Sequence, residues 1–423
     1  MREMKNSGIG WVHNIPASWD VIKGKYVFTN NKLIVGSKVE EYDRLALTLN
    51  GVIKRSKDDN EGLQPVKFDT YQILKKDELV FKLIDLQNIS TSRVGLSPYI
   101  GIVSPAYIIL KSSGEIHPQF AEKYYLMMWM NQVFNALGDS GVRSSLNSSE
   151  LLELFIPTPP IDEQKRVAAY LDEQCKKIDE IMADIQNQID TLEDYKKSVI
   201  SEAVTKGLDP DAAMKDSGIA FVGKIPAHWE LHPVYYYFSE GKIKNTGCTE
   251  NNLLSLSYGN IIRKDINTSD GLLPASFSTY NIVEKDDIII RPTDLQNDKR
   301  SLRTGLVKEK GIITSAYIDL KPKTNVNSRY FHYLLHSYDV KKVFYNMGNG
   351  VRQGLNFGEF SKLFVFNPPI KEQEEIAEYL DSKCAKIDSI IEDKKAQLEI
   401  IESYKKSLIY EYVTGKKEVP ENE

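Results

Sequence analysis

The chain has 423 residues, enough for two or three domains that each bury a core of their own. Hydrophobic residues make up 41% and charged residues 27%, a globular composition, and no run of 18 apolar residues is present that could span a membrane. The N-terminus lacks the apolar stretch of a secretory signal, and three cysteines do not make a disulfide framework, so we expect a cytoplasmic protein.

The net charge of −5 is unevenly distributed. Segments 161–206 and 370–416 together hold 22 acidic and 15 basic residues, and 417–423 hold three Glu and one Lys. The rest of the chain is therefore mildly basic, with a net charge of +4. This balance permits binding to nucleic acid without demonstrating it.

The sequence repeats itself at an interval of about 209 residues. The matching pairs are Lys5–Ile9 with Lys215–Ile219, Ile15–Trp19 with Ile225–Trp229, Asp85–Asn88 with Asp294–Asn297, Gly141–Arg143 with Gly350–Arg352, Pro159–Gln164 with Pro368–Gln373, Lys177–Asp179 with Lys386–Asp388, and Tyr195–Ser198 with Tyr404–Ser407. The interval is too long for a solenoid. It indicates a duplicated globular domain and a duplicated helix, and therefore a target with two similar halves.

Each globular half reads as short strands with one aromatic-rich helical stretch, which predicts an α+β domain of roughly 150 residues. The strands expected in the first half are Phe68–Leu74, Glu78–Ile84 and Gly101–Leu110, and those in the second are Phe277–Val283, Asp287–Arg291 and Gly311–Leu320. The helical stretches are Pro118–Leu137 and Asn327–Met347. Trp19 and Trp229 are expected in the core.

A long helix is predicted after each Pro-Pro pair, because proline and acidic residues both favour a helix N-terminus. Apolar residues then recur with 4,3 spacing from Leu171 to Ala203 and from Leu380 to Tyr412, the seam of a coiled coil. Lys196 and Lys405 occupy one seam position in the two copies. Each is either an end-of-coil lysine, a register-setting polar residue or a contact for a partner subunit.

The length of the linker between the first helix and the second domain determines how the two long helices pair. It spans about eight residues and reaches at most roughly 28 Å, whereas each helix is roughly 65–70 Å long. The second domain must therefore lie at the far end of the first helix, and its own helix runs back antiparallel. The alternative is a swapped dimer that pairs the same seams between chains. The predicted segments are 1–158, 159–207, 208–367, 368–416 and 417–423: a domain, a helix, a domain, a helix and a tail.

The motifs that could carry catalysis have simpler interpretations. Asn367-Pro368-Pro369-Ile370 resembles part of an amino-methylating motif but lacks its aromatic residue, and its mate begins with Thr158, so a helix start is favoured. His332 and His336 have the spacing of two metal ligands, but no Cys cluster or zinc-protease Glu accompanies them. No phosphate-binding loop is present. The chain therefore reads as a binding protein with no catalytic, cofactor or metal residues.

Two repeated loops are candidates for contacting nucleic acid. Asn and Gln can bond the edge of adenine, Arg that of guanine, and Asp can accept from cytosine. The alternative is a turn whose Asp and Asn cap their own backbone. The candidate residues are Asp85, Gln87, Asn88, Arg93 and Arg143 in the first half and Asp294, Gln296, Asn297, Arg303 and Arg352 in the second. Because both halves share these residues, we expect related half-sites.

The order of these motifs resembles the DNA specificity subunit of type I restriction-modification systems. The resemblance rests on Ser-Gly-Ile…Ile-Pro-x-x-Trp, a strand-rich body, Pro-Pro-Ile-x-Glu-Gln and a long helix ending Tyr-Lys-Lys-Ser…Val-Thr, all given twice. It covers essentially the whole chain. One departure is that positions 204–207 read Val-Thr-Lys-Gly, whereas 413–415 read the usual Val-Thr-Gly.

The resemblance implies two target-recognition domains, each reading one half of a bipartite site in double-stranded DNA, with paired helices as a spacer. It implies docking of two methyltransferase subunits that bring S-adenosylmethionine, and restriction subunits that bring ATP and Mg²⁺. This subunit would itself be non-catalytic. The alternatives are a coiled-coil adaptor that binds only protein and a specificity fragment of a fused restriction-methylation enzyme.

Overall fold

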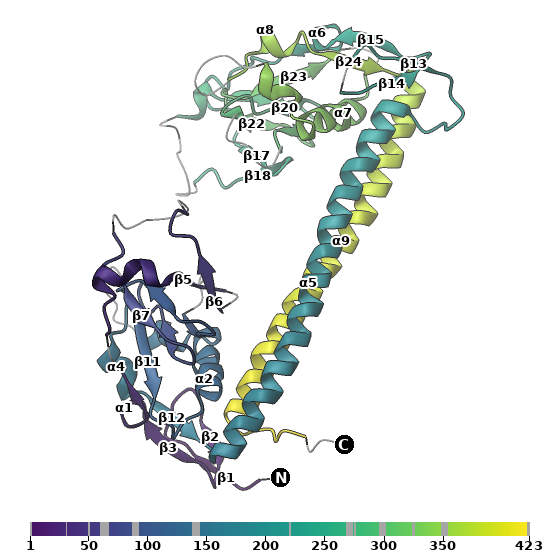
Figure 1. The fold of residues 1–423 in the computed structure, drawn as a ribbon. Coiled ribbons are helices and arrows are strands. Elements are labelled where there is room, and N and C mark those ends of the chain that lie inside the picture. The colour runs from purple at the N-terminus through teal and green to yellow at the C-terminus, as the bar shows by residue number, and fades with distance from the viewer. Residues whose placement is uncertain are drawn as a thin grey trace. The chain divides into compact units, whose positions relative to one another are not determined.

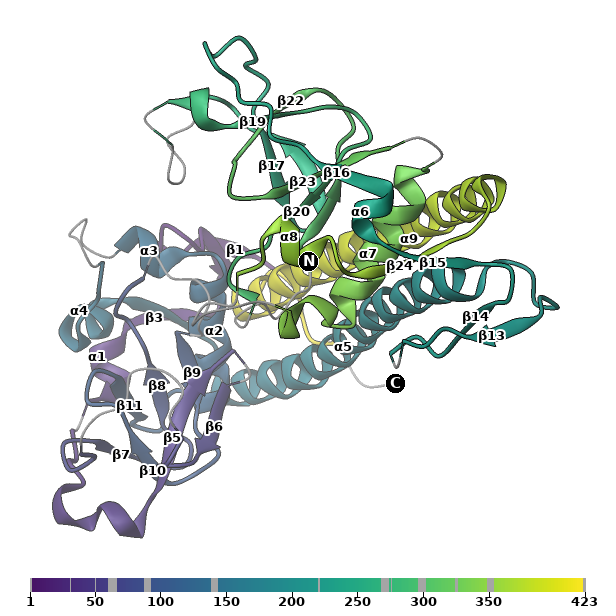
Figure 2. The ribbon, with the colours of Figure 1, turned by 90° about the horizontal axis from the view of Figure 1, so that it is seen from above.

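The computed structural model describes residues 2–30, 32–49, 51–59, 67–86, 93–137, 144–219, 221–267, 274, 276–295, 302–323, 326–347 and 354–420 (Figures 1 and 2). The chain divides into two compact units, Met1–Ile185 with Ala396–Glu423, and Gln186–Lys395. Each unit thus holds one globular domain, the beginning of the helix that follows it and the end of the other helix. This division runs through the helices, whereas the predicted segments end at them.

The first unit contains two four-stranded sheets, ordered β6-β5-β10-β7 and β4-β11-β8-β9. Its strands are β1 (Met4–Asn6), β2 (Asn14–Pro16), β3 (Asp20–Lys23), β4 (Phe28–Thr29), β5 (Asp43–Thr48), β6 (Gly51–Arg55), β7 (Gln72–Leu74), β8 (Leu79–Phe81), β9 (Val94–Leu96), β10 (Gly101–Val103), β11 (Ile108–Ser112) and β12 (Phe155–Thr158). The helices are α1 (Gly24–Val27), η1 (Gly36–Glu41), α2 (Pro118–Met130), α3 (Val133–Leu137), α4 (Ser148–Glu153) and the start of α5 (Ile161–Lys206). Strand β10 pairs parallel with β5, and β8 pairs antiparallel with β9 and β11.

The second unit repeats this plan with a four-stranded sheet ordered β16-β23-β20-β21 and the pairs β17-β18 and β19-β22. Its strands are β13 (Met214–Asp216), β14 (Lys224–Pro226), β15 (Glu230–Pro233), β16 (Phe238–Glu240), β17 (Leu254–Ser257), β18 (Asn260–Arg263), β19 (Asn281–Val283), β20 (Ile288–Ile290), β21 (Thr304–Leu306), β22 (Gly311–Ile313), β23 (Ile318–Pro322) and β24 (Phe364–Asn367). The helices are α6 (Val234–Tyr237), η2 (Phe277–Thr279), α7 (Ser328–Val340), η4 (Val343–Asn346), α8 (Phe357–Phe360) and the start of α9 (Ile370–Val413). The predicted α+β class is confirmed.

Several predicted strands were too long: Phe68–Leu74 and Glu78–Ile84 shorten to β7 and β8, Phe277–Val283 begins with η2 and only its end is β19, and two others each prove to be two strands. Gly101–Leu110 is two strands, β10 and β11, separated by a turn in which Tyr107 N donates to Ser104 O. Gly311–Leu320 divides in the same way into β22 and β23. The intervening Ser-Pro-Ala and Thr-Ser-Ala segments fold as turns, so that each apolar run crosses from one sheet to another. Apolar residues on both sides of a turn gave no change of periodicity by which to detect it.

The seams of α5 and α9 pair with each other in one chain, antiparallel, as predicted (Figure 1). In the first unit Tyr170 stacks on Tyr412 with ring centroids 4.7 Å apart, and Lys405 Nζ lies 2.5 Å from Asp179 Oδ1. In the second unit Lys196 Nζ lies 2.6 Å from Asp388 Oδ2. Rising residue numbers on α5 therefore face falling numbers on α9. In each unit, the Asp of a Lys-Ile-Asp motif on one helix pairs with the first Lys of the Tyr-Lys-Lys-Ser motif on the other helix.

Reversing one of these ion pairs should weaken the helix pairing. We expect Lys196→Glu, which places like charges opposite each other, to destabilise the second unit by about 1 kcal/mol, and Asp388→Lys in the same chain to restore it. Thermal unfolding of the single and double variants measures both effects. Lys197→Glu is the matched control, since Lys197 pairs with Asp194 on its own helix. If Lys196→Glu and Lys197→Glu lower the unfolding temperature by the same amount, the cross-helix ion pair does not set the register.

The Trp of each repeat closes the junction between domain and helices. Trp19 and Trp229 are fully buried, which confirms the core prediction, and their Nε1 atoms donate to Glu163 (3.1 Å) and Glu372 (2.9 Å) at the starts of α5 and α9. The opposite helix ends against the same Trp. Gly415, with φ 69°, has no space for a Cβ beside the ring of Trp19. The spacing of these motifs, which is the same in the two copies, therefore builds one junction per unit.

The Gln that follows each of these Glu residues joins three segments. Gln164 and Gln373 are both 1% exposed. The Gln164 amide accepts from His117 N at 2.7 Å, just before α2, and donates to Pro159 O at 2.8 Å. Gln373 accepts from Asn327 N before α7 and donates to Pro368 O, both at 2.9 Å. The Pro-Pro-Ile-x-Glu-Gln motif is therefore a structural clamp, which supports the helix-start interpretation.

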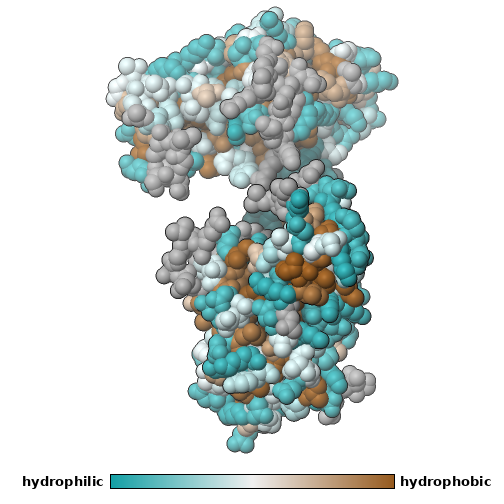
Figure 3. Space-filling model, turned by 60° about the vertical axis from the view of Figure 1, so that its left-hand side comes forward, coloured by the Kyte–Doolittle hydropathy of each residue, from teal (hydrophilic) through white to brown (hydrophobic). Residues whose placement is uncertain are grey.

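The surface of the described residues mixes polar and apolar side chains (Figure 3). Large apolar residues such as Leu49, Ile100 and Tyr258 are exposed in separate turns and loops. Within the part of the chain that the structure describes, none of the helices has the length and apolar composition needed to cross a bilayer.

Candidate nucleic-acid interface

In each unit, the first candidate loop begins where a central strand ends. Beyond β8 and β20 the main chain turns at Asp85 (φ 55°) and Asp294 (φ 59°), both in the left-handed region. Asp tolerates this region better than most residues because its short polar side chain can hydrogen-bond locally. The next residue, Leu86 or Leu295, is fully buried in the core. The start of each loop is thus fixed to the domain, while the Asp85 side chain is exposed and that of Asp294 is half-buried.

In each unit, hydrogen bonds join the described residues that flank the two candidate loops. Leu86 N donates to Ser144 O at 3.1 Å, and Leu146 N donates to Leu83 O at 2.9 Å. In the second unit Leu355 N donates to Pro292 O at 2.9 Å. Residue 144 directly follows the Gly-Val-Arg loop. The sequence could not predict this proximity, since about 50 residues separate the loops in the chain.

Arg93 and Arg303 are buried at the bases of these loops, with exposed fractions of 1% and 3%. Arg93 Nη2 donates to Asp85 O at 2.8 Å. Arg303 Nη2 donates to Asp294 O at 2.7 Å, and its Nη1 donates to Thr293 O at 2.5 Å. Burial lowers the pKa of the Arg93 guanidinium, an effect that the Asp85 carboxylate opposes. In this conformation both arginines donate to main-chain carbonyl groups.

The remaining predicted residues, Gln87, Asn88, Arg143, Gln296, Asn297 and Arg352, lie outside the described residues.

A second pair of cations stands next to the buried arginines. Lys82 N donates to Arg93 O at 3.0 Å, and Arg291 N donates to Arg303 O at 2.8 Å, each one residue beyond the central strand. The side chain of Arg291 is exposed and that of Lys82 is half-buried. Burial, and then the charge of Arg93, lower the pKa of the Lys82 ammonium. Sequence reasoning missed this pair, although the repeat interval places both cations at equivalent positions.

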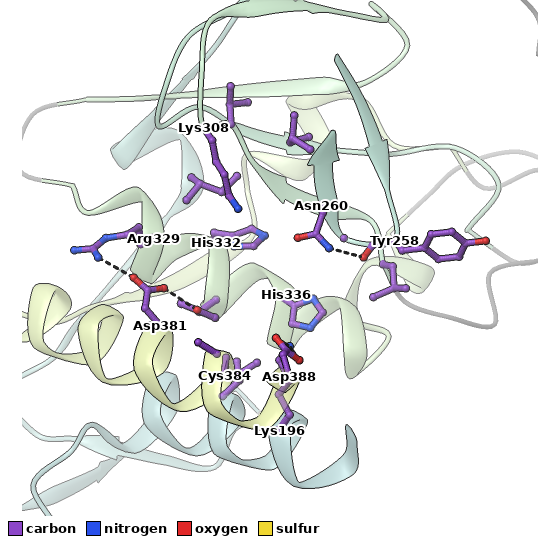
Figure 4. Close-up of a pocket in the computed structure, with 18 of the residues that line it drawn as sticks. Lys196, Tyr258, Asn260, Lys308, Arg329, His332, His336, Asp381, Cys384 and Asp388 are labelled. Carbon is purple, nitrogen blue, oxygen red and sulfur yellow. Dashed lines mark hydrogen bonds and ion pairs between the residues drawn. The ribbon is translucent and has the colours of Figure 1, made fainter. Parts of the chain in front are cut away.

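His332 and His336 lie on one face of α7, in a pocket of about 630 Å³ lined by residues of β18, β21, α5, α7 and α9 (Figure 4). Their ring centroids are 6.5 Å apart. Burial lowers the pKa of both to about 4, so both are neutral near pH 7. The nearby acids are engaged elsewhere: Asp381 accepts from Arg329 and Tyr333, and Asp388 from Lys196. In the described ranges, no group of three or more His, Cys, Asp and Glu is arranged to hold a metal ion.

The chain matches the family model described as the type I restriction modification DNA specificity domain at residues 21–191 and again at 241–400. Two curated relatives come from Methanocaldococcus jannaschii. The putative type I restriction enzyme MjaX specificity subunit is 27% identical over 70% of this chain and 68% of its own length. The type I restriction enzyme MjaVIII specificity subunit is 25% identical over 95% of this chain and 93% of its own.

The fold is similar to that of a chain in a solved structure titled the structural basis underlying complex assembly and conformational transition of the type I R-M system. The TM-score is 0.68 at 12% sequence identity, with coverage of 95% of this chain and 99% of the other. At this identity the likeness concerns the fold.

Proposed function

Because the chain belongs to the family of type I restriction-modification DNA specificity subunits, which are non-catalytic and carry no cofactor of their own, we propose that each globular domain reads one half of a bipartite site in double-stranded DNA. The chain works as part of a type I restriction-modification complex and binds DNA through its specificity domains. The observation that carries the bipartite proposal is the repetition of one loop framework in both units: a left-handed Asp, a buried Leu and a buried Arg at the end of the central strand.

The proposed reading residues lie in the paired loops of each unit. Gln and Asn offer both a donor and an acceptor to adenine, and Arg a fork of donors to guanine or phosphate. The proposed DNA contacts are Asp85, Gln87, Asn88, Arg143, Asp294, Gln296, Asn297 and Arg352, and we add Lys82 and Arg291 as phosphate contacts. The hydrogen bonds between the loop bases support a common reading surface in each unit.

The partners proposed are two methyltransferase subunits, one for each unit, which bring S-adenosylmethionine and the methylating site. Restriction subunits with ATP and Mg²⁺ complete the proposed complex. The doubling of the chain supports this stoichiometry, since each unit presents an equivalent junction of domain and paired helices. A chain with two equivalent units also suits a duplex site with two halves.

Methylation mapping tests the function. DNA from cells that express this chain with its methyltransferase partner should carry methyladenine in one split motif, on opposite strands. Expression of the partner with a chain truncated before the second domain is the control. Absence of any modified motif, with partner and cofactor present, would contradict DNA specificity and favour the protein-binding adaptor. Methyl transfer by the purified chain alone would favour the fused-enzyme fragment.

The double variant Gln296→Ala and Asn297→Ala tests the reading loop. We expect relaxed recognition of the half-site read by the second domain, each lost base contact costing about 1–3 kcal/mol, with the other half-site unchanged. Binding of duplexes that carry single base-pair changes measures it. The matched variant Gln87→Ala and Asn88→Ala should relax the other half-site instead. Unchanged discrimination in both would show that the motif is only a capped turn.

A further inference from the structure

We propose that Arg93 and Arg303 are positioning residues, which hold the main chain at the base of the reading loop and do not themselves contact DNA. The proposal rests on the proposed function of the loops but makes a separate claim about how they are held. Both side chains lie beneath the loop base, and the hydrogen bonds given above run to main-chain carbonyl groups.

The second unit shows the clamp most fully. The Arg303 guanidinium donates to the carbonyl groups of Arg291, Thr293 and Asp294, at 3.2, 2.5 and 2.7 Å. These three residues lie between the end of β20 and the start of the loop. The main chain of Arg303 is fixed in turn, because its N donates to Asp339 Oδ2 on the buried face of α7 at 2.8 Å. One arginine therefore ties the loop base to both the sheet and the helix.

The first unit uses the same device with a loop of different length. Arg93 follows Asp85 by eight residues, whereas Arg303 follows Asp294 by nine. In both units the guanidinium nevertheless reaches the carbonyl oxygen of the Asp in the left-handed conformation. The same contact therefore forms across two loops that differ in length by one residue. A reading loop needs such a fixed base, because the side chains that contact DNA can then differ while the main chain from which they start stays in place.

The choice of arginine is informative because burying a guanidinium is unfavourable. An apolar side chain of similar volume would fill the same space without losing the hydration of a charge. What arginine adds is a planar fork of donors that can satisfy several carbonyl groups at once. Lysine has one donor atom and cannot span Thr293 O and Asp294 O in the same geometry. The position thus favours a residue that fixes main-chain geometry.

The proposal changes what the repetition implies about the target. The main chain of Asp85, together with Leu86 and Arg93, forms the loop base, as do their mates. The repetition of this framework does not require equal half-sites. The expectation of related half-sites then depends on the remaining proposed contacts, which are the side chains of Asp85, Gln87, Asn88 and Arg143 and of their mates.

The experiment compares Arg303→Met and Arg303→Lys with Arg291→Gln, an exposed neighbour, and with Arg263→Gln, an exposed arginine on β18. Each full-length chain is assembled with its methyltransferase partner. Binding to the mapped duplex, and to duplexes with single base-pair changes, is measured at several salt concentrations. Hydrogen exchange of the free chain is followed at the amides of Arg291, Arg303 and Leu355.

A clamp predicts a specific pattern. Both Arg303 variants should exchange faster at these amides and lose discrimination at several positions of one half-site, by about tenfold or more, with the salt dependence unchanged. Arg291→Gln should instead reduce the salt slope by about one contact and keep discrimination, and Arg263→Gln should change neither.

Three results would overturn the clamp. Relaxation at a single base pair in Arg303→Met would assign Arg303 to base reading, and a reduced salt slope would assign it to phosphate. Unchanged hydrogen exchange in Arg303→Lys, the variant that keeps the charge and is better able to fold, would show that the arginine does not hold the loop base. Faster exchange in a protein whose wild-type form has no sequence preference would support the clamp and refute the proposed function instead.

Discussion

Replacing Gln373 with Ala should destabilise the second unit by about 3–5 kcal/mol. The Gln373 side chain is buried and serves three partners, Asn327 N, Pro368 O and the Asn367 side chain, at 2.9, 2.9 and 3.0 Å. Truncation leaves these groups without their bonds at a site closed to water, and a buried polar group that loses its partner costs about 1–3 kcal/mol. The loss separates the start of α9 from the start of α7, so it should act on the whole domain–helix junction.

Calorimetric unfolding of the full chain measures this effect. Because the chain has two compact units, we expect Gln373→Ala to shift the transition of the second unit and the matched Gln164→Ala to shift that of the first. Glu374→Ala, at the exposed neighbouring position, should stay within about 0.5 kcal/mol of the parent. Gln373→Glu separates size from bonding, since it keeps the acceptor for Asn327 N but loses the donors. If Gln373→Glu is as stable as the parent, the bonds that Gln373 donates do not contribute to the stability of the second unit.

Replacing Asp319 with Asn should stabilise the second unit at alkaline pH and have little effect at pH 4. Asp319 is 1% exposed, in the strand position that Ile109 occupies in the first unit. Burial, and then the neighbouring Asp287 carboxylate, raise its pKa to about 7. Lys321 Nζ lies 2.7 Å from Asp287 Oδ2 but 3.9 Å from Asp319 Oδ2, so its ion pair is chiefly with Asp287. Asp319 therefore keeps its proton at pH values where an ordinary Asp is ionised.

The direction of the pH effect follows from the raised pKa. An unfolded Asp titrates near pH 3.9, so the folded chain binds the proton more tightly between about pH 4 and 7. The contribution of Asp319 to the stability of the second unit is therefore most favourable below this window. It becomes less favourable as pH rises through the window and is constant above it. Asn stays neutral throughout, and its amide can donate to Asp287. We expect a gain of a few kcal/mol at pH 8, since each unit of pKa shift is worth about 1.4 kcal/mol.

Melting curves of Asp319→Asn and the parent, recorded from pH 4 to 8, measure this difference. Asp286→Asn is the matched control, because Asp286 is exposed in the turn next to Asp287 and should leave the pH profile unchanged. A difference between Asp319→Asn and the parent that is constant across this range would show that Asp319 does not titrate there.

The long-range plan of this protein was predictable from its sequence. The repeat interval, the Pro-Pro helix starts and the 4,3 seams predicted two α+β domains and an antiparallel helix pair, because periodicity and chain reach are properties of the sequence itself. The structure adds a reason for the repeated motifs. Trp19 closes the junction between domain and helices, Gln164 joins the start of α5 to the start of α2, and Lys196 pairs across the two long helices. Their mates do the same, and these roles appear only when distant segments meet.

The assignment of side chains within the candidate site was not predictable. Arg93 follows its Asp in a polar segment, and a sequence cannot distinguish a guanidinium that faces DNA from one that points inward to carbonyl groups. The sequence by itself determined the doubled architecture and the position of the loops at the strand ends. Only the tertiary structure decided that Leu86 and Leu146 bond to the opposite loop base and that Arg93 and Arg303 are buried, because burial depends on the packing of segments far apart in the chain.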